Sequence, residues 1–391
     1  MRVAVIGSGI VGAACALALV EGGAEVVVID RVGVAGETSS RCEGNLLVSD
    51  KAPGAEADLA VASNAMWRVL AARLDAERPA GQPATEFEAK GGIVVAFGGG
   101  EAALERFAEV QRATGIRAEA MDVASLAAAE PYLSREVVHA VHYPDDAQIQ
   151  PSAATQALLD TAIRSGARLV IGDVTGPLDR SGRADRSGRL AGVMTTAGPI
   201  EADAVVNCAG PWAGEVAARL GARLDIRPRR GVILVTTPMP QRVFHKVYDS
   251  DYVGAVGSGD AALQTSTVVE STPGGTVLIG SSRERVGFDD RPGVAPAAAI
   301  AAKAVRLFPF LEETLLLRSY FGFRPYAPDH LPVIGADPEI AGLVHATGHE
   351  GAGIGLAPAT AQLVAHAVLG APTALDPAPF LPGRAGLQET A

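Results

Sequence analysis

The chain has 391 residues, of which 48% are hydrophobic and 20% are charged. That length is enough for two or three domains and that composition is typical of a folded protein, so extensive disorder is excluded. Lysine and arginine number 33 against 44 acidic residues, a net charge of −11, and such an acidic chain lacks the basic surface that general nucleic-acid binding needs.

The first uncharged stretch, residues 3–20, is long enough to be mistaken for a signal peptide or a membrane span. Gly7, Ser8, Gly9 and Gly12 interrupt it, and no other uncharged run approaches the length of a spanning helix. The three cysteines lie far apart and offer neither a disulfide framework nor zinc-ligand spacing. We therefore expect a cytoplasmic protein without a membrane span and without a bound metal.

The N-terminus has the order strand, glycine-rich turn, helix, strand, acidic residue. Residues 2–6 form a short β-branched run, Gly7-Ser-Gly9-Ile-Val-Gly12 follows, and the next predicted strand ends at Asp30. In this order the first glycine permits a tight turn, the second lets a pyrophosphate approach the backbone, and the third lets helix and strand pack closely. The acidic residue can accept hydrogen bonds from a ribose. The pattern predicts dinucleotide binding; its alternative is a glycine-rich helix–strand contact without a ligand.

Further elements follow from hydrophobic periodicity and from turn residues. We expect helices over residues 13–21, 55–78, 101–114, 122–130 and 151–165, a hairpin over 86–97, and strands at 137–143, 168–171, 190–196 and 204–208. The repeated Asp-Arg-Ser-Gly-Arg at residues 179–183 and 185–189 is expected to be a hairpin tip rather than a ligand loop.

The second half of the sequence has a different pattern of predicted elements. Strand-like runs at 231–236, 265–269, 276–281 and 315–323 surround a single helix at 295–307, which indicates a mostly antiparallel sheet. A strand at 343–347, a glycine-rich turn and a helix to about residue 369 then close the chain. The expected fold is α/β: a Rossmann-like part joined to an α+β part built on a mostly antiparallel sheet.

Four ordered motifs resemble a known family. They are Gly7-Ser-Gly9-Ile-Val-Gly12, Asp203-Ala-Val-Val-Asn-Cys-Ala-Gly-Pro-Trp212, Gly322-Phe-Arg-Pro325 and Gly348-His-Glu-Gly-Ala-Gly-Ile-Gly-Leu-Ala-Pro358. The set is similar to the FAD-dependent D-amino acid oxidase and glycine oxidase (DAO) family, which includes sarcosine oxidase. Ser39-Ser-Arg-Cys-Glu-Gly-Asn45 and Gly348-His-Glu-Gly-Ala-Gly353 most resemble the flavin subunits of hydrogen cyanide synthase, opine oxidase and D-hydroxyproline dehydrogenase.

The resemblance implies two domains built from alternating segments. The FAD-binding domain would comprise residues 1–84, 151–224 and 324–391, and the substrate domain would comprise residues 85–150 and 225–323.

The family pattern also assigns residues to the cofactor. Those expected to contact the diphosphate, ribose, adenine or ring of FAD are Gly7, Gly9, Ile10, Val11, Gly12, Asp30, Arg31, Thr38, Ser39, Glu43, Gly44, Asn45, Val174, Gly210, His349, Glu350, Gly351, Ala352, Gly353, Ile354 and Gly355. Sarcosine oxidases attach their flavin through a cysteine near the position of Arg324, whereas no cysteine follows Cys208 here. The resemblance therefore implies non-covalent FAD.

Two residues are expected on the substrate side. Arg324 matches the arginine that pairs with a substrate carboxylate, and its planar fork fits that group. Glycine-oxidase-like members carry a second arginine where this chain has Gly351, and Glu350 beside it is expected to face a substrate amine. An interior ion pair is the alternative role for Arg324.

The resemblance implies an enzyme that oxidises the CH–NH bond of an amino acid, or of an N-substituted or cyclic amino acid of the D-amino acid, hydroxyproline or opine type. Hydride would pass to flavin N5 and leave an imine. Two alternatives stay open: an oxygen-using glycine, sarcosine or D-amino acid oxidase, and a flavin electron-transfer subunit without its own substrate site. Partner electron-transfer subunits and an oligomeric state are also expected.

Overall fold

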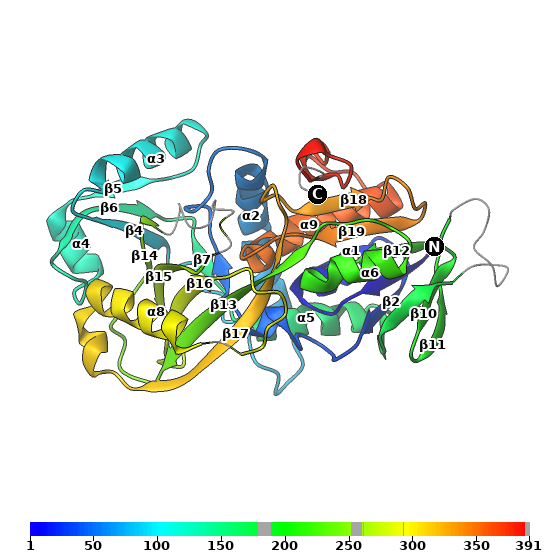
Figure 1. Ribbon diagram of the computed structural model, residues 1–391, viewed down its shortest axis with the longest axis horizontal. Helices are drawn as coiled ribbons and strands as arrows, with labels where there is room; N and C mark the ends of the chain where they lie inside the picture. Colours follow the sequence, from blue (N-terminus) through cyan, green and yellow to red (C-terminus); the bar gives the residue numbers. More distant parts are fainter. Residues whose placement is uncertain (179–188, 252–259, 261, 292, 388–391) are drawn as a thin grey trace.

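The computed structural model describes residues 1–178, 189–251, 260, 262–291 and 293–387. Within them the strands form two large sheets, at opposite ends of an elongated molecule (Figure 1). The first has six strands in the order β18-β19-β12-β1-β2-β8 and is parallel except for the β18–β19 pair. Its strands are β1 (Arg2–Ile6), β2 (Glu25–Asp30), β8 (Arg168–Ile171), β12 (Ala204–Asn207), β18 (Val333–Ala336) and β19 (Leu343–Thr347).

The second sheet has eight strands in the order β17-β13-β16-β15-β14-β4-β6-β5. All of its pairs are antiparallel except β14–β4, so the predicted mostly antiparallel sheet is confirmed. Its strands are β4 (Gly92–Phe97), β5 (Glu119–Met121), β6 (Val137–Tyr143), β13 (Arg227–Thr236), β14 (Lys246–Asp249), β15 (Gln264–Ser271), β16 (Val277–Arg283) and β17 (Leu316–Tyr326).

Two small sheets complete the set in the described residues. One contains β9 (Val174–Pro177), β10 (Gly192–Thr195) and β11 (Gly198–Glu201), and the other pairs β3 (Asn45–Leu46) with β7 (Ala147–Gln148).

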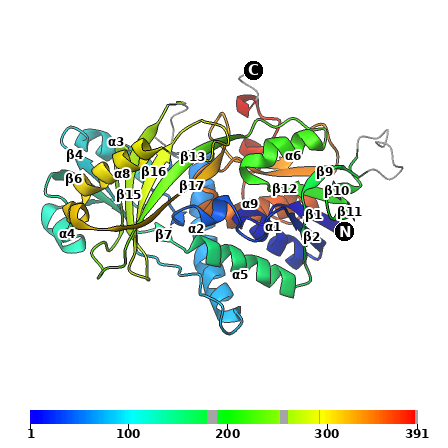
Figure 2. The same ribbon diagram turned by 60° about the horizontal axis from the view of Figure 1, so that its bottom comes forward.

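The helices divide between the two large sheets. In both views α1, α5 and α9 lie with the parallel sheet, and α3, α4 and α8 lie with the eight-stranded sheet (Figures 1 and 2). The helices are α1 (Ile10–Glu21), α2 (Ala55–Glu77), α3 (Glu101–Ala113), α4 (Val123–Ala129), α5 (Pro151–Arg164), α6 (Ala213–Arg219), α8 (Val294–Leu307) and α9 (Gly353–Leu369).

Helix α1 explains the uncharged stretch at the start of the chain. It packs against both α5 and α9 as well as its own sheet, so it is apolar on nearly every side. Its small residues allow this close approach, and Leu17 and Leu19 are buried in the same cluster. Within the described residues, every helix is too short or too polar to cross a bilayer.

Two sequence predictions need correction or comment. The hairpin over residues 86–97 is wrong, because β4 pairs with β6 and β14 while Glu88 bridges to Gln148. Residues 92–97 do form a strand, but its partners lie far away in the chain. The predicted domain boundary after Phe323 falls inside β17, which continues to Tyr326. The domain division itself stays a prediction, and the repeated motif at residues 179–189 lies almost wholly outside the described residues.

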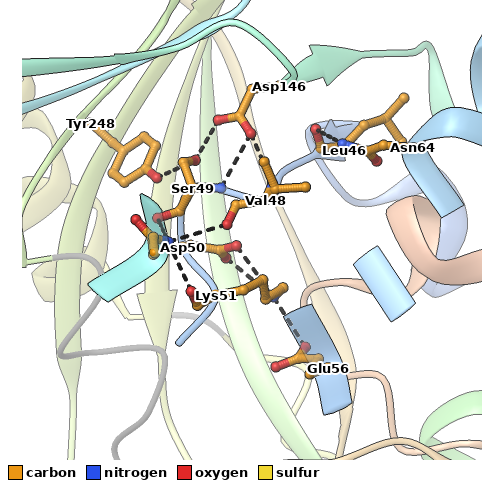
Figure 3. A network of polar contacts seen from close by, with 10 residues as sticks. Leu46, Val48, Ser49, Asp50, Lys51, Glu56, Asn64, Asp146 and Tyr248 are labelled. Atoms are coloured by element: carbon orange, nitrogen blue, oxygen red, sulfur yellow. Dashed lines mark hydrogen bonds and ion pairs between the residues drawn. The ribbon is translucent and has the colours of Figure 1, made fainter. Parts of the chain in front are cut away.

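A buried polar network ties the loop after β3 to the eight-stranded sheet (Figure 3). Asp146, which follows β6, accepts hydrogen bonds from the backbone N–H of Val48 at 2.8 Å and from the hydroxyl of Ser49. Ser49 in turn accepts a hydrogen bond from the hydroxyl of Tyr248 on β14. Gln111 of α3 donates to the carbonyls of Ser49 and Lys51, at 3.1 and 2.8 Å. These bonds fix how the loop after β3 meets the eight-stranded sheet.

Asp146→Asn is expected to reduce the pH dependence of stability. Burial raises the pKa of Asp146 to about 7, with the bonds from Ser49 and Val48 opposing it. The unfolded carboxyl titrates near 4, so the folded state holds its proton to higher pH and stability falls as pH rises from about 4 to about 7. The amide accepts the same backbone bonds but does not titrate, so most of that slope should vanish.

Urea unfolding at pH 5 and pH 8 measures this slope. Asp122→Asn is the control, because that carboxylate is exposed at the N-terminus of α4. An Asp146→Asn protein with the full wild-type slope would contradict the assignment.

Candidate active site

A large cleft lies where the carboxyl ends of the parallel strands meet the eight-stranded sheet. It encloses about 1550 Å³, part of it open to solvent, and is lined by the loops that follow β1, β2, β12 and β19 and by β13 and β17. In open α/β sheets ligands bind at this edge. Its lining runs from the loop after β2, past the N-terminus of α1, to the turn after β19, so the cleft suits an extended ligand.

The floor of the cleft is made of glycines that admit no side chain. A Cβ at Gly12 would lie 1.9 Å from the carbonyl oxygen of Gly7, and one at Gly7 would lie 2.4 Å from that of Cys208. Gly7 also has a φ of +106°, which favours glycine. At Gly9 a Cβ would lie 3.0 Å from the hydroxyl oxygen of Ser39. This close packing brings the N-terminus of α1 to the cleft, where its dipole favours anions.

Asp30 and Ser39 organise the loops around that helix end. The carboxylate of Asp30 accepts hydrogen bonds from the backbone N–H groups of Ser8, Val32 and Gly33, at 2.7, 2.8 and 2.8 Å. The hydroxyl of Ser39 accepts from the N–H of Ile10 at 2.9 Å. Both residues therefore shape the backbone that a diphosphate would approach.

The far end of the cleft is closed by an aromatic stack. Arg31 lies 4.1 Å from the ring centre of Trp212, and Phe288 stacks on Trp212 at 5.1 Å with an interplanar angle of 6°. Val174 lines the same end, and its carbonyl accepts from Arg219 at 2.8 Å. Sequence reasoning noted Trp212 only as part of a motif. Its partner Phe288 comes from a loop without a sequence signal.

The glycine-rich turn after β19 forms another wall. His349 is buried, and its Nε2 lies 2.9 Å from the hydroxyl of Thr360. Burial lowers the pKa of His349 to about 3, so this imidazole is neutral at ordinary pH. Gly355 faces away from the cleft, and a Cβ there would lie 3.3 Å from the carbonyl oxygen of Asn45. The turn thus holds the Asn45 loop in place.

Arg324 reaches into the cleft from β17. Its Nη1 donates to the carbonyl of Ser282 at 2.8 Å. Its guanidinium occupies the space where a side chain at Gly231 would lie, since a Cβ there would be 2.0 Å from Nη1. Gly351 faces Arg324 from the opposite wall, with a Cβ position 3.6 Å from Nε. Sequence reasoning missed Gly231, although the arginine run at 227–230 marks the approach to it.

Glu350 has protein partners. Its carboxylate accepts from Nη1 of Arg229 at 3.0 Å and lies 3.8 Å from Nδ1 of His330. Burial alone would raise the pKa of Glu350, but His330 and Arg229 outweigh it and hold that pKa below its usual range. Arg229 is fully buried and also donates to Gln264 at 3.0 Å. Sequence reasoning missed this arginine.

The structure brings most of the predicted site residues together. All of them line the cleft except Gly12, Ala352 and Gly355. Gly12 and Gly355 act through backbone packing instead. The individual role of each residue stays a prediction.

Comparisons with known proteins decide the family. The model of the family described as "FAD dependent oxidoreductase" (DAO) matches residues 2–367. The chain belongs to this family. It is 33% identical to hydrogen cyanide synthase subunit HcnC of Pseudomonas aeruginosa, over 68% of this chain and 59% of that protein. It is 30% identical to glycine oxidase of Pseudomonas putida, over 68% of each.

A solved structure agrees. The glycine oxidase of Geobacillus kaustophilus superposes with a TM-score of 0.86 at 28% identity, covering 98% of this chain and 99% of that one. The family resemblance and the α/β fold predicted from the sequence are confirmed. The alignment with HcnC spans less than two thirds of that subunit's length.

The cleft fits the FAD of this family. Gly7, Gly9 and Gly12 let the turn after β1, the Ser39 loop and α1 pack so closely that the helix N-terminus, where a diphosphate would bind, reaches the cleft. The loop residues Gly44 and Asn45 and the turn at Gly351 would hold the ring, beside Arg324. The cleft lining therefore combines a helix N-terminus suited to a diphosphate with a guanidinium beside the loops that would hold the ring.

The FAD is expected to be released without breaking a covalent bond. Of the three cysteines, Cys15 and Cys208 are buried. Cys42 lines the cleft, and burial raises its pKa to about 12, so its thiol is a poor nucleophile. Acid precipitation of the holoenzyme should leave yellow flavin in the supernatant. Flavin that stays in the pellet would contradict this prediction.

Proposed function

We propose that the protein is an FAD-dependent dehydrogenase or oxidase of amino acids, acting on the CH–NH bond of a free, N-substituted or cyclic amino acid. The observation that supports this best is Arg324, a guanidinium at the cleft held between two glycine positions, Gly231 and Gly351. A bidentate fork of this kind suits a carboxylate. The glycine oxidases among the relatives also support the substrate class.

The chain's own residues bind and orient in this reaction. Bound FAD supplies the two-electron acceptor. Arg324 holds the substrate carboxylate, so that the amine and its carbon face the ring wall. His349 is neutral and hydrogen-bonded to Thr360, so we assign it contact with the cofactor rather than proton transfer. Substrate and cofactor bound in the cleft would displace water around Arg324, which would strengthen its ion pair with the carboxylate.

Partner subunits and the electron acceptor belong to this proposal. One relative is named as a subunit of hydrogen cyanide synthase, which favours a dehydrogenase that passes electrons to a partner chain. Others are named glycine oxidase, which favours direct reaction with oxygen. We propose the first, in a cytoplasmic oligomer. Three unpaired cysteines fit a reducing compartment.

The test is anaerobic flavin bleaching of the holoenzyme with D-amino acids, sarcosine, prolines and opines. Bleaching by at least one of them supports amino acid oxidation, and bleaching by none favours an electron-transfer subunit without its own substrate site. Reoxidation of the reduced enzyme by oxygen and by an acceptor dye then separates the two classes. Fast reaction with oxygen together with efficient glycine turnover would establish a glycine oxidase instead.

A further inference from the structure

Glu43 carries an unsatisfied buried oxygen at the cleft. It lies in the loop between the short 3-10 helix η1 (Thr38–Ser40) and β3, lines the cleft and is 7% exposed. Its Oε1 makes no hydrogen bond among the described residues, and its Oε2 accepts only a long bond, 3.4 Å, from the amide of Asn45. A buried carboxylate oxygen without a partner is costly, so a bound ligand is the natural source of a donor.

The eight-stranded sheet makes room for this side chain. A Cβ at Gly280 of β16 would lie 1.8 Å from Oε1 of Glu43. The carboxylate therefore rests against bare backbone, in space that any other residue at position 280 would fill.

Arg324 rests against the same part of the sheet. It donates to the carbonyl of Ser282, two residues after Gly280 on β16. Two residues of a strand span about 7 Å. Both charges also act on the thiol of Cys42, whose pKa is raised by burial and by Glu43 and lowered by Arg324. A carboxylate and a guanidinium thus lie on neighbouring parts of one cleft wall.

The nearby cation has other partners. Nζ of Lys246 contacts Oδ1 of Asn45 and the carboxylate of Glu270 on β15. Burial lowers the pKa of Lys246, although the carboxylate of Glu43 lies close enough to oppose this effect. Lys246 therefore holds the Asn45 loop, while Oε1 of Glu43 keeps no hydrogen-bond partner among the described residues.

Glu350 differs from Glu43 in this respect. Its carboxylate is paired with Arg229 and lies near His330. A substrate amine at Glu350 would have to compete with a fully buried arginine, whereas at Glu43 it would supply the missing donor.

We propose that Glu43 binds the amine of the substrate while Arg324 binds its carboxylate. This rests on the proposed function and names its substrate class: an α-amino acid with a primary or secondary amine. Each end of such a molecule needs a hydrogen bond of ordinary length, about 2.8 Å, to a side chain that rests against β16.

Matched ligands test this in the holoenzyme. Proline and glycine carry a carboxylate and an amine; tetrahydrofuran-2-carboxylate and methoxyacetate keep the carboxylate and replace the amine with an ether oxygen, which cannot donate a hydrogen bond. Binding is measured anaerobically from the perturbation or bleaching of the flavin spectrum. In the Glu43→Gln variant, the Kd of the amine ligand should rise at least tenfold. The Kd of its oxygen counterpart should change less than twofold. Arg324→Ala should weaken both members.

Controls separate the possible failures. Glu136→Gln changes an exposed residue paired with Arg306 and should bind all ligands as the wild type does. If Glu43→Gln is unstable, Glu43→Asp replaces it. Aspartate keeps the charge, so it should weaken amine binding less than glutamine does. FAD affinity should be unchanged in Glu43→Gln; a loss of FAD would make Glu43 a cofactor contact and overturn the inference. Equal effects on amine and oxygen ligands would also overturn it while leaving amino acid oxidation intact. No binding and no bleaching by any amino acid would refute the proposed function itself.

Discussion

Arg324→Ala is expected to lower kcat/KM for the amino acid substrate by a factor of about 30 to several thousand. Removing one partner of a buried, hydrogen-bonded charge pair costs about 2–5 kcal/mol. FAD should stay bound, because the glycine floor and the Asp30 and Ser39 hydrogen bonds that shape the dinucleotide end do not involve Arg324. Steady-state kinetics and the flavin-to-protein ratio measure the two effects separately.

Arg324→Lys should recover little of the loss. Lysine offers one point charge rather than a planar fork, and its shorter ammonium would not reproduce the bond to Ser282 that orients the side chain. Arg318→Ala is the matched control, because Arg318 lies on the same strand but is exposed and contacts Tyr320. Wild-type kcat/KM in Arg324→Ala would remove this residue from the substrate site.

Local sequence was enough to predict the dinucleotide end of the cleft. Gly7, Gly9 and Gly12 act within one strand–turn–helix unit, so their spacing alone carries the geometry. The contact that makes Gly12 necessary lies within this unit, at the carbonyl oxygen of Gly7, whereas Gly7 packs on Cys208 and Gly9 on the hydroxyl of Ser39. The glycine spacing is a readable pattern even though two of these contacts come from elsewhere in the chain.

The substrate side depends on pairings that no local pattern records. In the sequence, Gly231 and Gly280 look like ordinary strand glycines. Once β13, β16 and β17 pair, Arg324 and Glu43 fill the space where side chains at these two positions would lie. In the sequence Glu350 and Glu43 are equivalent acidic residues in glycine-rich loops. Only the assembled structure pairs Glu350 with Arg229, from a strand more than a hundred residues away. The amine role predicted for Glu350 stays untested, and its pairing favours Glu43.

Gly12→Ala is expected to abolish FAD retention. The added methyl would lie 1.9 Å from the carbonyl oxygen and 2.9 Å from the carbonyl carbon of Gly7, both rigid backbone atoms, and 3.4 Å from Cβ of Cys208. No side-chain rotation relieves this clash, so α1 must move away from β1. Overpacking of a core commonly costs about 1–3 kcal/mol, and a backbone clash belongs at or above the top of that range.

The displacement acts directly on the cofactor because the N–H groups of α1 and the Gly7 turn belong to the same rigid unit. The flavin content after gel filtration and the thermal midpoint of the apoprotein should both fall. With FAD added in excess, the folded fraction of the variant should still bind less flavin than the same amount of folded wild-type protein. Gly98→Ala is the matched control, since a Cβ there meets no atom within 4 Å. Wild-type affinity for FAD in Gly12→Ala would contradict this prediction. It would mean that α1 can shift away from β1 without harm, and that the contact between Gly12 and Gly7 does not form the dinucleotide site.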